Sequence, residues 1–386
     1  MNSHLLECLY CGCENLDEVV FYRYLNRITS DCKLWPPGGR FGVCQSCGYP
    51  QTYATEIWHA EIEKIYADYT VYYQSGGQEQ SVYDPVSGEP VLRSDYLVHK
   101  LKQTGAIAAE GRLLDVGCGN GNFLRAFAKA FPEWKLNGVE WDEKHNEILQ
   151  GIPSFEGFYS RGVDDIPGDF DMISLIHCFE HIPDPTSLLS SLRKKLKPEG
   201  HLFIEVPDCR VNPFMLLVAD HCSHFSVESL NLLLLHEGFD PICATGDWLP
   251  KEVSLLARKA EQKPEALHLD YSYGKQLEQE IAWLSKVSAH SNDLSRHGSI
   301  GLFGTSVGST WLWAELKGRV KFFVDEDPNR IGLHHCGLPI FSPQDAPKNT
   351  PIFLALPPLV ARQVRMRLQS VLPTLVSPSD FAEISQ

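Results

Sequence analysis

The chain has no block of basic residues and no apolar run long enough to cross a membrane. It carries 49 acidic residues against 34 Lys and Arg, a formal net charge of −15. Duplex nucleic acid and anionic membranes both attract clustered Lys and Arg, so we expect neither as a partner and predict a small-molecule ligand. The longest apolar runs, such as Phe214 to Ala219 and Leu230 to Leu235, are far shorter than a membrane span.

A secretory signal pattern, a fixed internal repeat and a low-complexity tract are also missing. We therefore expect a cytoplasmic protein, as a monomer or homodimer. Twelve cysteines are typical of a secreted disulfide scaffold, but this chain of 386 residues has no signal and places several cysteines in apolar segments, so we expect reduced thiols. The length and the 43% hydrophobic content predict two or three globular domains.

The most informative segment is an apolar strand, residues 113–116, that runs into three closely spaced glycines, Gly117, Gly119 and Gly121. Glycine lets the backbone approach a ligand, and the helix expected over residues 123–131 would point its first N–H groups at the same pocket. A second apolar strand ends in Glu140, about 20 residues later, where a carboxylate can hold a ribose diol. The pattern predicts a nucleotide-type ligand on a doubly wound α/β unit.

The order Asp-x-Gly-x-Gly-x-Gly, beginning at Asp115, resembles the first motif of class I S-adenosylmethionine-dependent methyltransferases. The resemblance implies that the glycine loop holds the aminocarboxylate end of the cofactor, that Glu140 holds the ribose and that residues 163–167 lie along the adenine. Residues 170–185 resemble the fourth strand and its following loop. The alternative is a doubly wound domain that binds another nucleotide. The implied cofactor residues are Asp115, Gly117, Cys118, Gly119, Asn120, Glu140, Trp141, Asp164 and His177.

Along the chain we predict four parts: a cysteine-bearing module (residues 1–75), a Rossmann-like methyltransferase core (76–258), a linking helix (259–289) and a C-terminal Rossmann-like α/β domain (290–386). The linking helix is predicted because Leu277, Ile281, Leu284 and Val287 share one helical face.

Two cysteine pairs, Cys8-x-x-Cys11 and Cys44-x-x-Cys47, are each followed by glycine. Each pair can form a knuckle, and four thiolates can hold Zn²⁺ tetrahedrally in a closed structural site. Such a site would stabilise a module too small to bury enough apolar surface. Because the separation between the pairs exceeds the usual zinc-ribbon spacing, ordinary reduced cysteines or a redox pair stay open as alternatives. Cys13 and Cys32 are expected to be bystanders.

The succession of a four-cysteine module, a methyltransferase core and a C-terminal nucleotide-fold unit resembles the zinc-containing nucleotide-sugar C-methyltransferases of deoxysugar pathways. The resemblance covers nearly the whole chain. Its specific pieces are the two cysteine pairs, the core motifs, Tyr-x-x-Tyr-Tyr-Gln-Ser-Gly-Gly at 69–77, Asp-His-Cys-Ser-His-Phe-Ser at 220–226, Phe-Phe-Val-Asp at 322–325 followed by Asp-Pro-Asn at 327–329, and Gly-Leu-Pro-Ile at 337–340 followed by Ser-Pro at 342–343.

The resemblance implies methylation of a carbon next to the ketone of a nucleotide-linked 4-keto hexose. A general base near neutral pKa would form an enolate, and a donor would hold the developing oxyanion. His221 is the first candidate for the base, with Asp220 orienting it, while His181 and Tyr73 would line the sugar pocket. The alternative for His181 is a packed or capping histidine, and for Tyr73 it is aromatic packing of the N-terminal module.

The sequence departs from the family pattern at three places. Val218 stands where the family has a tyrosine, His224 stands where tyrosine is usual, and the strand expected over 352–356 runs into Pro357-Pro358. An isopropyl group cannot transfer a proton, so an O-methyltransferase acting on a sugar or polysaccharide precursor is the second prediction. A catalytically silent cofactor-binding scaffold is the third, and the clustered titratable groups argue against it.

The C-terminal domain repeats the plan of a strand, glycines, a helix and a second strand that ends in an acid. Its glycines are Gly301, Gly304 and Gly308, and the acid is Asp325. The glycine spacing does not match a dinucleotide site, so we expect no second nicotinamide cofactor. We predict a platform for the nucleotide end of the substrate, with a purely structural domain as the alternative.

Overall fold

The computed structural model of the protein describes residues 7–70, 78–83, 90–141, 143–160, 162–262 and 274–378. The chain forms two compact units that are not consecutive segments. The first unit comprises Met1–Asn15, Ser81–Asp208 and Phe225–Tyr271, and the second comprises Leu16–Gln80, Cys209–His224 and Ser272–Gln386. Within the described ranges, no helix combines the length and the apolar character that a membrane crossing needs.

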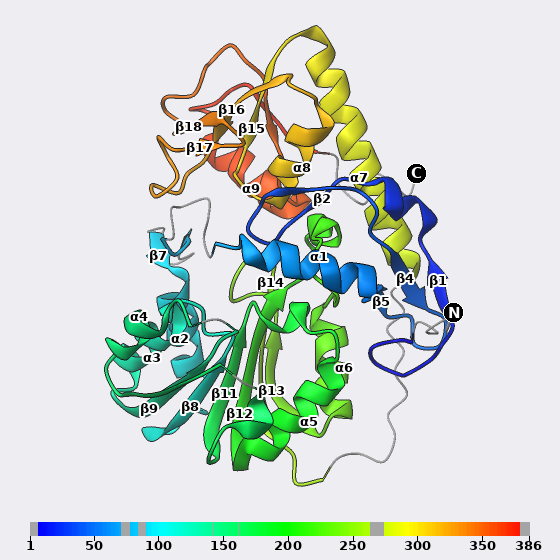
Figure 1. Ribbon diagram of the computed structural model, residues 1–386. Helices are drawn as coiled ribbons and strands as arrows, with labels where there is room; N and C mark the ends of the chain where they lie inside the picture. Colours follow the sequence, from blue (N-terminus) through cyan, green and yellow to red (C-terminus); the bar gives the residue numbers. More distant parts are fainter. Residues whose placement is uncertain are drawn as a thin grey trace. The chain divides into compact units, whose positions relative to one another are not determined.

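The first unit is built on a seven-stranded sheet in the order β10-β9-β8-β11-β12-β14-β13, whose middle strands lie side by side in Figure 1. Only β14 runs antiparallel to its neighbours β12 and β13. The central strand β8 buries residues 113–116 because a parallel strand is covered on both faces. The strands are β8 (Glu110–Val116), β9 (Glu133–Val139), β10 (Phe155–Tyr159), β11 (Phe170–Ile176), β12 (Leu196–Pro207), β13 (Phe239–Thr245) and β14 (Glu252–Lys259). This sheet confirms the predicted α/β Rossmann-like core.

Local signals explain where the helices of this unit begin. Asp184 caps α5 by accepting from the Ser187 N–H, with Pro185 in the first turn, and Ser226 and Ser229 form a capping box on α6. The helices are α2 (Arg93–Gln103), α3 (Asn122–Ala130), α4 (Asn146–Gln150), α5 (Pro185–Lys195) and α6 (Val227–His236); the 3-10 turns are η3 (Val163–Asp165) and η4 (Phe179–His181); β6 (Ser81–Tyr83) pairs with β7 (Pro90–Leu92).

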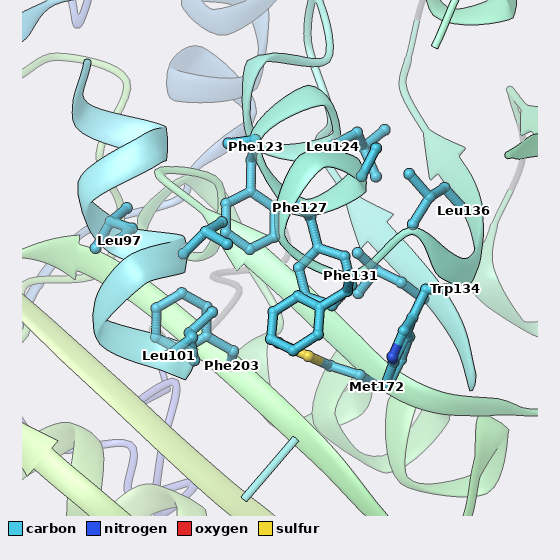
Figure 2. Packing of buried hydrophobic residues seen from close by; sticks show 14 of the residues in the cluster. Leu97, Leu101, Phe123, Leu124, Phe127, Phe131, Trp134, Leu136, Met172 and Phe203 are labelled. Atoms are coloured by element: carbon cyan, nitrogen blue, oxygen red, sulfur yellow. The ribbon is translucent and has the colours of Figure 1, made fainter. Parts of the chain in front are cut away.

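The core of the first unit is rich in aromatic rings. On α3, Phe127 stacks on Phe131 with ring centroids 4.6 Å apart and meets Trp134 edge-on at 5.3 Å. Figure 2 shows these rings together with Leu97 and Leu101 of α2, which belong to the same buried cluster. Because β8 leads directly into α3, burying one face of α3 also fixes the loop between them.

The second unit contains residues 16–80, which we call the N-terminal module from here on, and the chain segment 209–224. Its three-stranded antiparallel sheet has the order β1-β4-β5, and a separate hairpin joins β2 and β3. Thr55 caps the module's helix by accepting from the Trp58 N–H. The elements are β1 (Leu16–Glu18), η1 (Val20–Tyr24), β2 (Arg27–Ile28), β3 (Leu34–Trp35), β4 (Phe41–Cys44), β5 (Pro50–Thr52), α1 (Glu56–Ala67) and η5 (Pro213–Leu217).

The C-terminal part of the second unit is a six-stranded sheet in the order β17-β18-β16-β15-β19-β20. Helix α7 (Gly274–Leu294) begins within the predicted linking segment 259–289 and ends five residues beyond it, and Leu277, Ile281, Leu284 and Val287 on it are all buried. The remaining elements are η6 (Ser295–His297), β15 (Ile300–Phe303), α8 (Val307–Glu315), β16 (Val320–Val324), β17 (His334–His335), β18 (Leu338–Phe341), β19 (Ile352–Leu354), α9 (Pro358–Leu368) and β20 (Leu375–Val376). Helix α8 begins directly after Ser306 because Ser306 and Ser309 form a capping box.

Candidate cofactor and active site

The candidate cofactor site lies where the strand order of the first sheet reverses. The chain runs outward from β8 to β9 and β10, then returns to β11 and β12 on the other side of β8. At such a reversal the loops that follow neighbouring parallel strands separate and leave a crevice at the carboxyl edge. The residues predicted to bind the cofactor follow these strands in turn: Gly117, Cys118, Gly119 and Asn120 after β8, Glu140 and Trp141 after β9, Asp164 after β10 and His177 after β11.

The loop after β8 adopts a backbone that favours glycine. Gly117, Gly119 and Gly121 have φ values of +73°, +50° and +80°. A Cβ on Gly117 would lie 2.6 Å from the Cys178 Sγ, so a side chain would also clash there. The N–H groups of Gly117 and Cys118 both donate to the Val139 carbonyl, at 2.9 and 3.0 Å. The glycine loop is therefore fixed to the end of β9.

Glu140 joins this loop through its side chain. Its Oε2 accepts from the Gly119 N–H and its Oε1 from the Trp141 N–H, each at 2.8 Å. The carboxylate is only half-buried and keeps lone pairs for a ligand, and the Trp141 side chain is 91% exposed. Asp164 is exposed and accepts from the Ser191 hydroxyl at 3.0 Å.

Asp115 is a buried acid inside the site. Its Oδ1 accepts a hydrogen bond from the Ser174 hydroxyl at 2.6 Å, across the pair of strands β8 and β11. Burial raises the pKa of Asp115 to about 7, and the nearby charge of Glu140 adds to the shift. At neutral pH this carboxyl is therefore balanced between its neutral and charged forms, so a bound cation would favour its ionisation.

A second polar network surrounds His177, which is a non-glycine residue with a φ of +49°. Its Nδ1 lies 3.4 Å from Glu180 and its Nε2 lies 3.4 Å from Glu252, and Arg93 hydrogen-bonds to both His177 and Glu205. Burial raises the pKa of Glu205, while the Arg93 guanidinium opposes that shift. Glu180 is also buried, but hydrogen bonding from His177 lowers its pKa.

Sequence reasoning missed Arg93, Glu205 and Glu252 because they come from α2, β12 and β14 and belong to no local motif. His177, Glu205 and Glu252 can each offer one atom as a metal ligand, and these three atoms lie within 4.8 Å of one another. Such a set can hold a cation. The Arg93 guanidinium already supplies positive charge to this set. We therefore interpret the network as a charge-balanced support for His177.

Comparison with known proteins identifies this unit. Residues 92–244, which include β8 to β12, match the family described as methyltransferase domain. The protein is an S-adenosylmethionine-dependent methyltransferase. The glycine loop and Glu140 lie inside the matched region of the methyltransferase domain.

Curated relatives agree with this assignment. The chain is 25% identical over 178 residues to a ubiquinone biosynthesis O-methyltransferase of Xanthomonas campestris pv. campestris (strain B100), covering 44% of this chain and 70% of that protein. It is 29% identical over 140 residues to the protein of the same name from Xylella fastidiosa (strain M23), covering 33% and 52%. The chain thus spans about half to seven tenths of the length of these relatives.

A solved structure has a partial likeness. The 1,6-didemethyltoxoflavin-N1-methyltransferase of Burkholderia thailandensis, determined with bound 1,6-didemethyltoxoflavin and S-adenosylhomocysteine, is 17% identical. The likeness covers 58% of this chain and 96% of that one, with a TM-score of 0.39. At this level it supports no inference about the chemistry of this methyltransferase.

The predicted catalytic residues are distributed over both units of the methyltransferase. His181 lies in η4 of the first unit, its Nε2 4.0 Å from the Glu180 carboxylate. Asp220 and His221 lie in the second unit and are both buried. Tyr73 lies outside the described residues. His224, the second departure from the family pattern, is buried beside Thr52, and burial lowers its pKa to about 3, so it is a neutral packing residue.

Each cysteine pair forms a tight turn within its own unit. In the first, the Gly12 N–H donates to the Cys8 carbonyl at 3.0 Å; in the second, the Gly48 N–H donates to the Cys44 carbonyl at 2.8 Å. Gly12 and Gly48 have φ values of +67° and +73°. The Ser46 N–H also points at the Cys44 Sγ, 3.4 Å away, as expected for an amide that supports a thiolate. All twelve cysteines lie in the described ranges; Cys8, Cys44 and Cys47 are buried and Cys11 is exposed.

Proposed function

We propose that this methyltransferase methylates a carbon of a nucleotide-activated 4-keto deoxysugar through an enolate. The observation that carries the proposal is the buried acid-histidine pair Asp220-His221, in a chain whose first unit carries the methyltransferase glycine loop and Glu140. An O-methyltransferase needs a base for a hydroxyl group only, whereas carbon methylation requires a base that removes a proton next to a ketone.

In this mechanism His221 takes the proton from the ring carbon next to the ketone, and the C–H electron pair becomes the enolate. The Gly117 to Asn120 loop and Glu140 would hold the cofactor, with Trp141, Asp164 and His177 as further binding residues. When bound, S-adenosylmethionine supplies an electrophilic methyl carbon on sulfur. The enolate carbon would form the new C–C bond as the S–CH₃ bond breaks, and His221 would later release its proton to solvent. His181 and Tyr73 are proposed to line the sugar pocket and to donate to the enolate oxygen.

The second candidate is O-methylation of a sugar or polysaccharide precursor. Two observations favour it: the curated relatives are named O-methyltransferases, and Val218 has no proton to transfer. Val218 is buried and pairs with Ile28 through an isolated bridge, so it is a packing residue. A cofactor-binding scaffold without activity is the third candidate, and no contact in the structure favours it.

The test compares wild-type enzyme with His221→Asn on a panel of keto and reduced nucleotide sugars. If His221 is the base, kcat falls on the order of 10²-fold or more while cofactor affinity is unchanged. Without cofactor, the wild type but not the variant should exchange the acidic ring proton of a keto sugar for solvent deuterium. His99→Asn, on the exposed face of α2, is the matched control.

Locating the new methyl group by NMR separates the candidates. A methyl on oxygen, or an unchanged turnover in His221→Asn, would contradict the carbon mechanism, and no transfer to any acceptor would favour the scaffold.

We also propose that Cys8, Cys11, Cys44 and Cys47 hold one structural Zn²⁺. Both pairs make the same glycine turn, and an amide already points at the Cys44 sulfur. Metal analysis of protein purified without added zinc should give one Zn²⁺ per chain. Replacing both Cys44 and Cys47 with serine should abolish it, whereas Cys13→Ser should not. Zinc that survives the double replacement would exclude this ligand set.

A further inference from the structure

The segment 209–224 leaves the methyltransferase sheet between β12 and α6 and belongs to the second unit, where it is bound to the N-terminal module. The Tyr22 hydroxyl donates to the Leu216 carbonyl at 2.6 Å, and the Trp58 Nε1–H donates to the Ala219 carbonyl at 2.9 Å. Both bonds are buried. The segment is therefore held by side chains from residues 16–80, far from it in sequence.

His221 lies between two backbone anchors of this kind. Two residues before it, the Ala219 N–H donates to the Ile28 carbonyl at 2.8 Å. One residue after it, the Cys222 carbonyl accepts from the Thr52 N–H at 3.1 Å. The backbone on both sides of His221 is thus joined to the N-terminal module.

Ser30 holds the Asp220 carboxylate through both of its oxygens. Its Oδ1 accepts from the Ser30 N–H at 2.8 Å and its Oδ2 from the Ser30 hydroxyl at 2.5 Å. The Asp220 side chain is fully buried. A buried carboxylate depends on such donors because it has lost its water, and hydrogen bonds to an ionised acceptor are the stronger ones.

The loop that presents Ser30 is itself well held. It joins β2 to β3, and its ends are closed by the Thr29 N–H, which donates to the Lys33 carbonyl at 2.9 Å. The Thr29 hydroxyl donates to Asp31 at 2.5 Å, and Lys33 forms an ion pair with Asp31 at 3.0 Å. Ser30 therefore projects from a loop with little freedom to move.

We propose that Ser30 is a positioning residue for catalysis. By holding both oxygens of Asp220, it fixes the orientation of the adjacent His221 for proton removal. The proposal rests on the proposed role of His221 as the base. Through Ser30, the N-terminal module contributes to catalysis in addition to its structural role.

The first experiment measures position without any substrate. Amide hydrogen exchange of residues 219–224 should be about tenfold faster in Ser30→Ala than in wild type, because the bond from the Ser30 hydroxyl to Asp220 is lost. Ser30→Thr keeps both the N–H and the hydroxyl and should restore wild-type exchange. Thr55→Ala is the control, since it removes the cap of α1 in the same module without touching Asp220.

The second experiment measures methyl transfer in the same variants. We expect kcat to fall about tenfold in Ser30→Ala with an unchanged KM for the cofactor, to recover in Ser30→Thr and to stay near wild type in Thr55→Ala. Unchanged exchange in Ser30→Ala would overturn the proposal. So would faster exchange with unchanged kcat, or an equal loss of kcat in Thr55→Ala. Failure of the proposed function would show differently, as normal turnover of His221→Asn.

Discussion

The two large, mostly parallel sheets share one local plan, but the acid of that plan has different partners in each. In each, the glycine that follows the first strand donates its N–H to the last residue of the next strand: Gly117 to Val139 at 2.9 Å, and Gly304 to Val324 at 2.7 Å. In each, the following loop donates an N–H to the acid after that second strand: Gly119 to Glu140, and Thr305 to Asp325. The backbone plan is the same up to this point.

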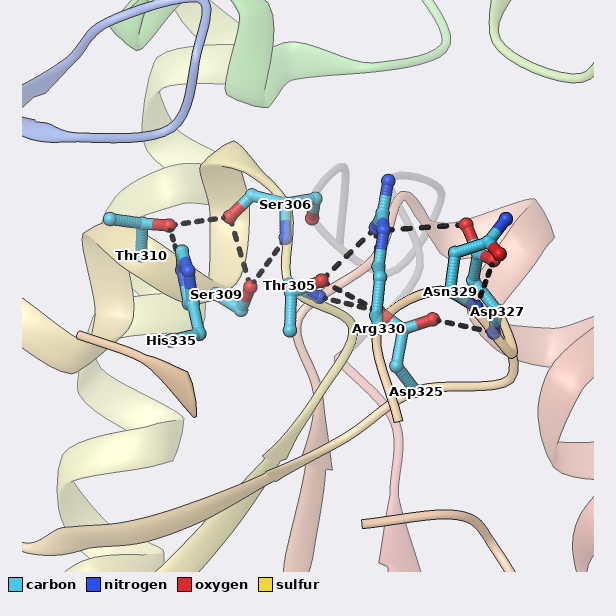
Figure 3. A network of polar contacts seen from close by, with 9 residues as sticks. All are labelled: Thr305, Ser306, Ser309, Thr310, Asp325, Asp327, Asn329, Arg330 and His335. Atoms are coloured by element: carbon cyan, nitrogen blue, oxygen red, sulfur yellow. Dashed lines mark hydrogen bonds and ion pairs between the residues drawn. The ribbon is translucent and has the colours of Figure 1, made fainter. Parts of the chain in front are cut away.

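The surroundings of the two acids differ. Glu140 is half-buried, bonded to main-chain N–H groups and next to the exposed Trp141. Asp325 is buried, and its Oδ2 also accepts from the Thr305 hydroxyl at 2.7 Å and from Arg330 at 3.4 Å. Figure 3 shows Arg330 reaching both Asp325 and Asp327. The first acid has capacity for a ligand, and the second is already neutralised by the protein.

The strands differ at the matching position as well. Two residues before the glycine, β8 has Asp115 and β15 has Leu302, both buried. A buried acid is costly unless it serves a ligand or a partner, whereas a buried leucine stabilises the sheet. The succession of strand, glycine, helix and acid therefore indicates the α/β fold but not a ligand site. Whether the acid can bind a ligand depends on the groups that it already contacts within the protein.

The largest expected effect is a loss of stability when the Arg330 charge beside Asp325 is removed. Arg330→Ala leaves Asp325 and Asp327 buried without their cation and should lower the free energy of unfolding by about 3–5 kcal/mol. Arg367→Ala breaks an exposed pair with Glu326 in the same unit and should cost less than about 1 kcal/mol. Chemical denaturation measures both. Equal effects would show that Asp325 is not locked by Arg330.

The next prediction tests the acid inside β8. Because burial raises the pKa of Asp115 from 3.8 to about 7, its native form favours the proton. Its contribution to stability is therefore complete below pH 3.8 and is lost as the pH rises through 7. Relative to Asp115→Asn, the wild type should lose a few kcal/mol of unfolding free energy between pH 4 and 7, at about 1.4 kcal/mol per pH unit. Parallel stability profiles of the two proteins would show that burial does not perturb Asp115.

The smallest expected effect is a change in cofactor affinity, which should distinguish Glu140 from Asp325. Glu140→Ala should weaken S-adenosylmethionine binding by about 1.5–3 kcal/mol because a charge-assisted contact to the ribose is lost. Asp325→Ala should leave that affinity unchanged. Isothermal titration calorimetry gives both values. Wild-type affinity in Glu140→Ala would remove the ribose assignment.

The sequence predicted best those features that depend on residues close together along the chain. The strand that ends in glycines, the stripe of Leu277, Ile281, Leu284 and Val287, and the glycine turns after the cysteine pairs all depend on neighbours a few residues apart. The position of Glu140 directly after β9 was predicted because the spacing of a βαβ unit is nearly constant. In these places local geometry alone sets the outcome.

Contacts between distant residues could not be predicted. The Arg93–Glu205 pair spans 112 residues and the Ser30–Asp220 bonds span 190. Arg93 and Ser30 stand in no motif, since an arginine at the start of a helix or a serine in a hairpin loop is ordinary. The sequence also offered no sign that residues 209–224 would join the N-terminal module, because their apolar run suits any buried environment.

The division of the chain into six alternating segments has a practical consequence for anyone who wishes to dissect this enzyme. No single cut separates one unit from the other. A fragment that starts at β8 and ends at β14 would still carry the stretch around Phe214, Leu217 and Val218, whose buried partners Trp283 and Trp311 would be missing. Such a fragment would expose to water an apolar surface that is buried in the whole chain, and it would be prone to aggregate. A shortened form of this enzyme would therefore have to omit the segment 209–224; otherwise the whole chain must be kept.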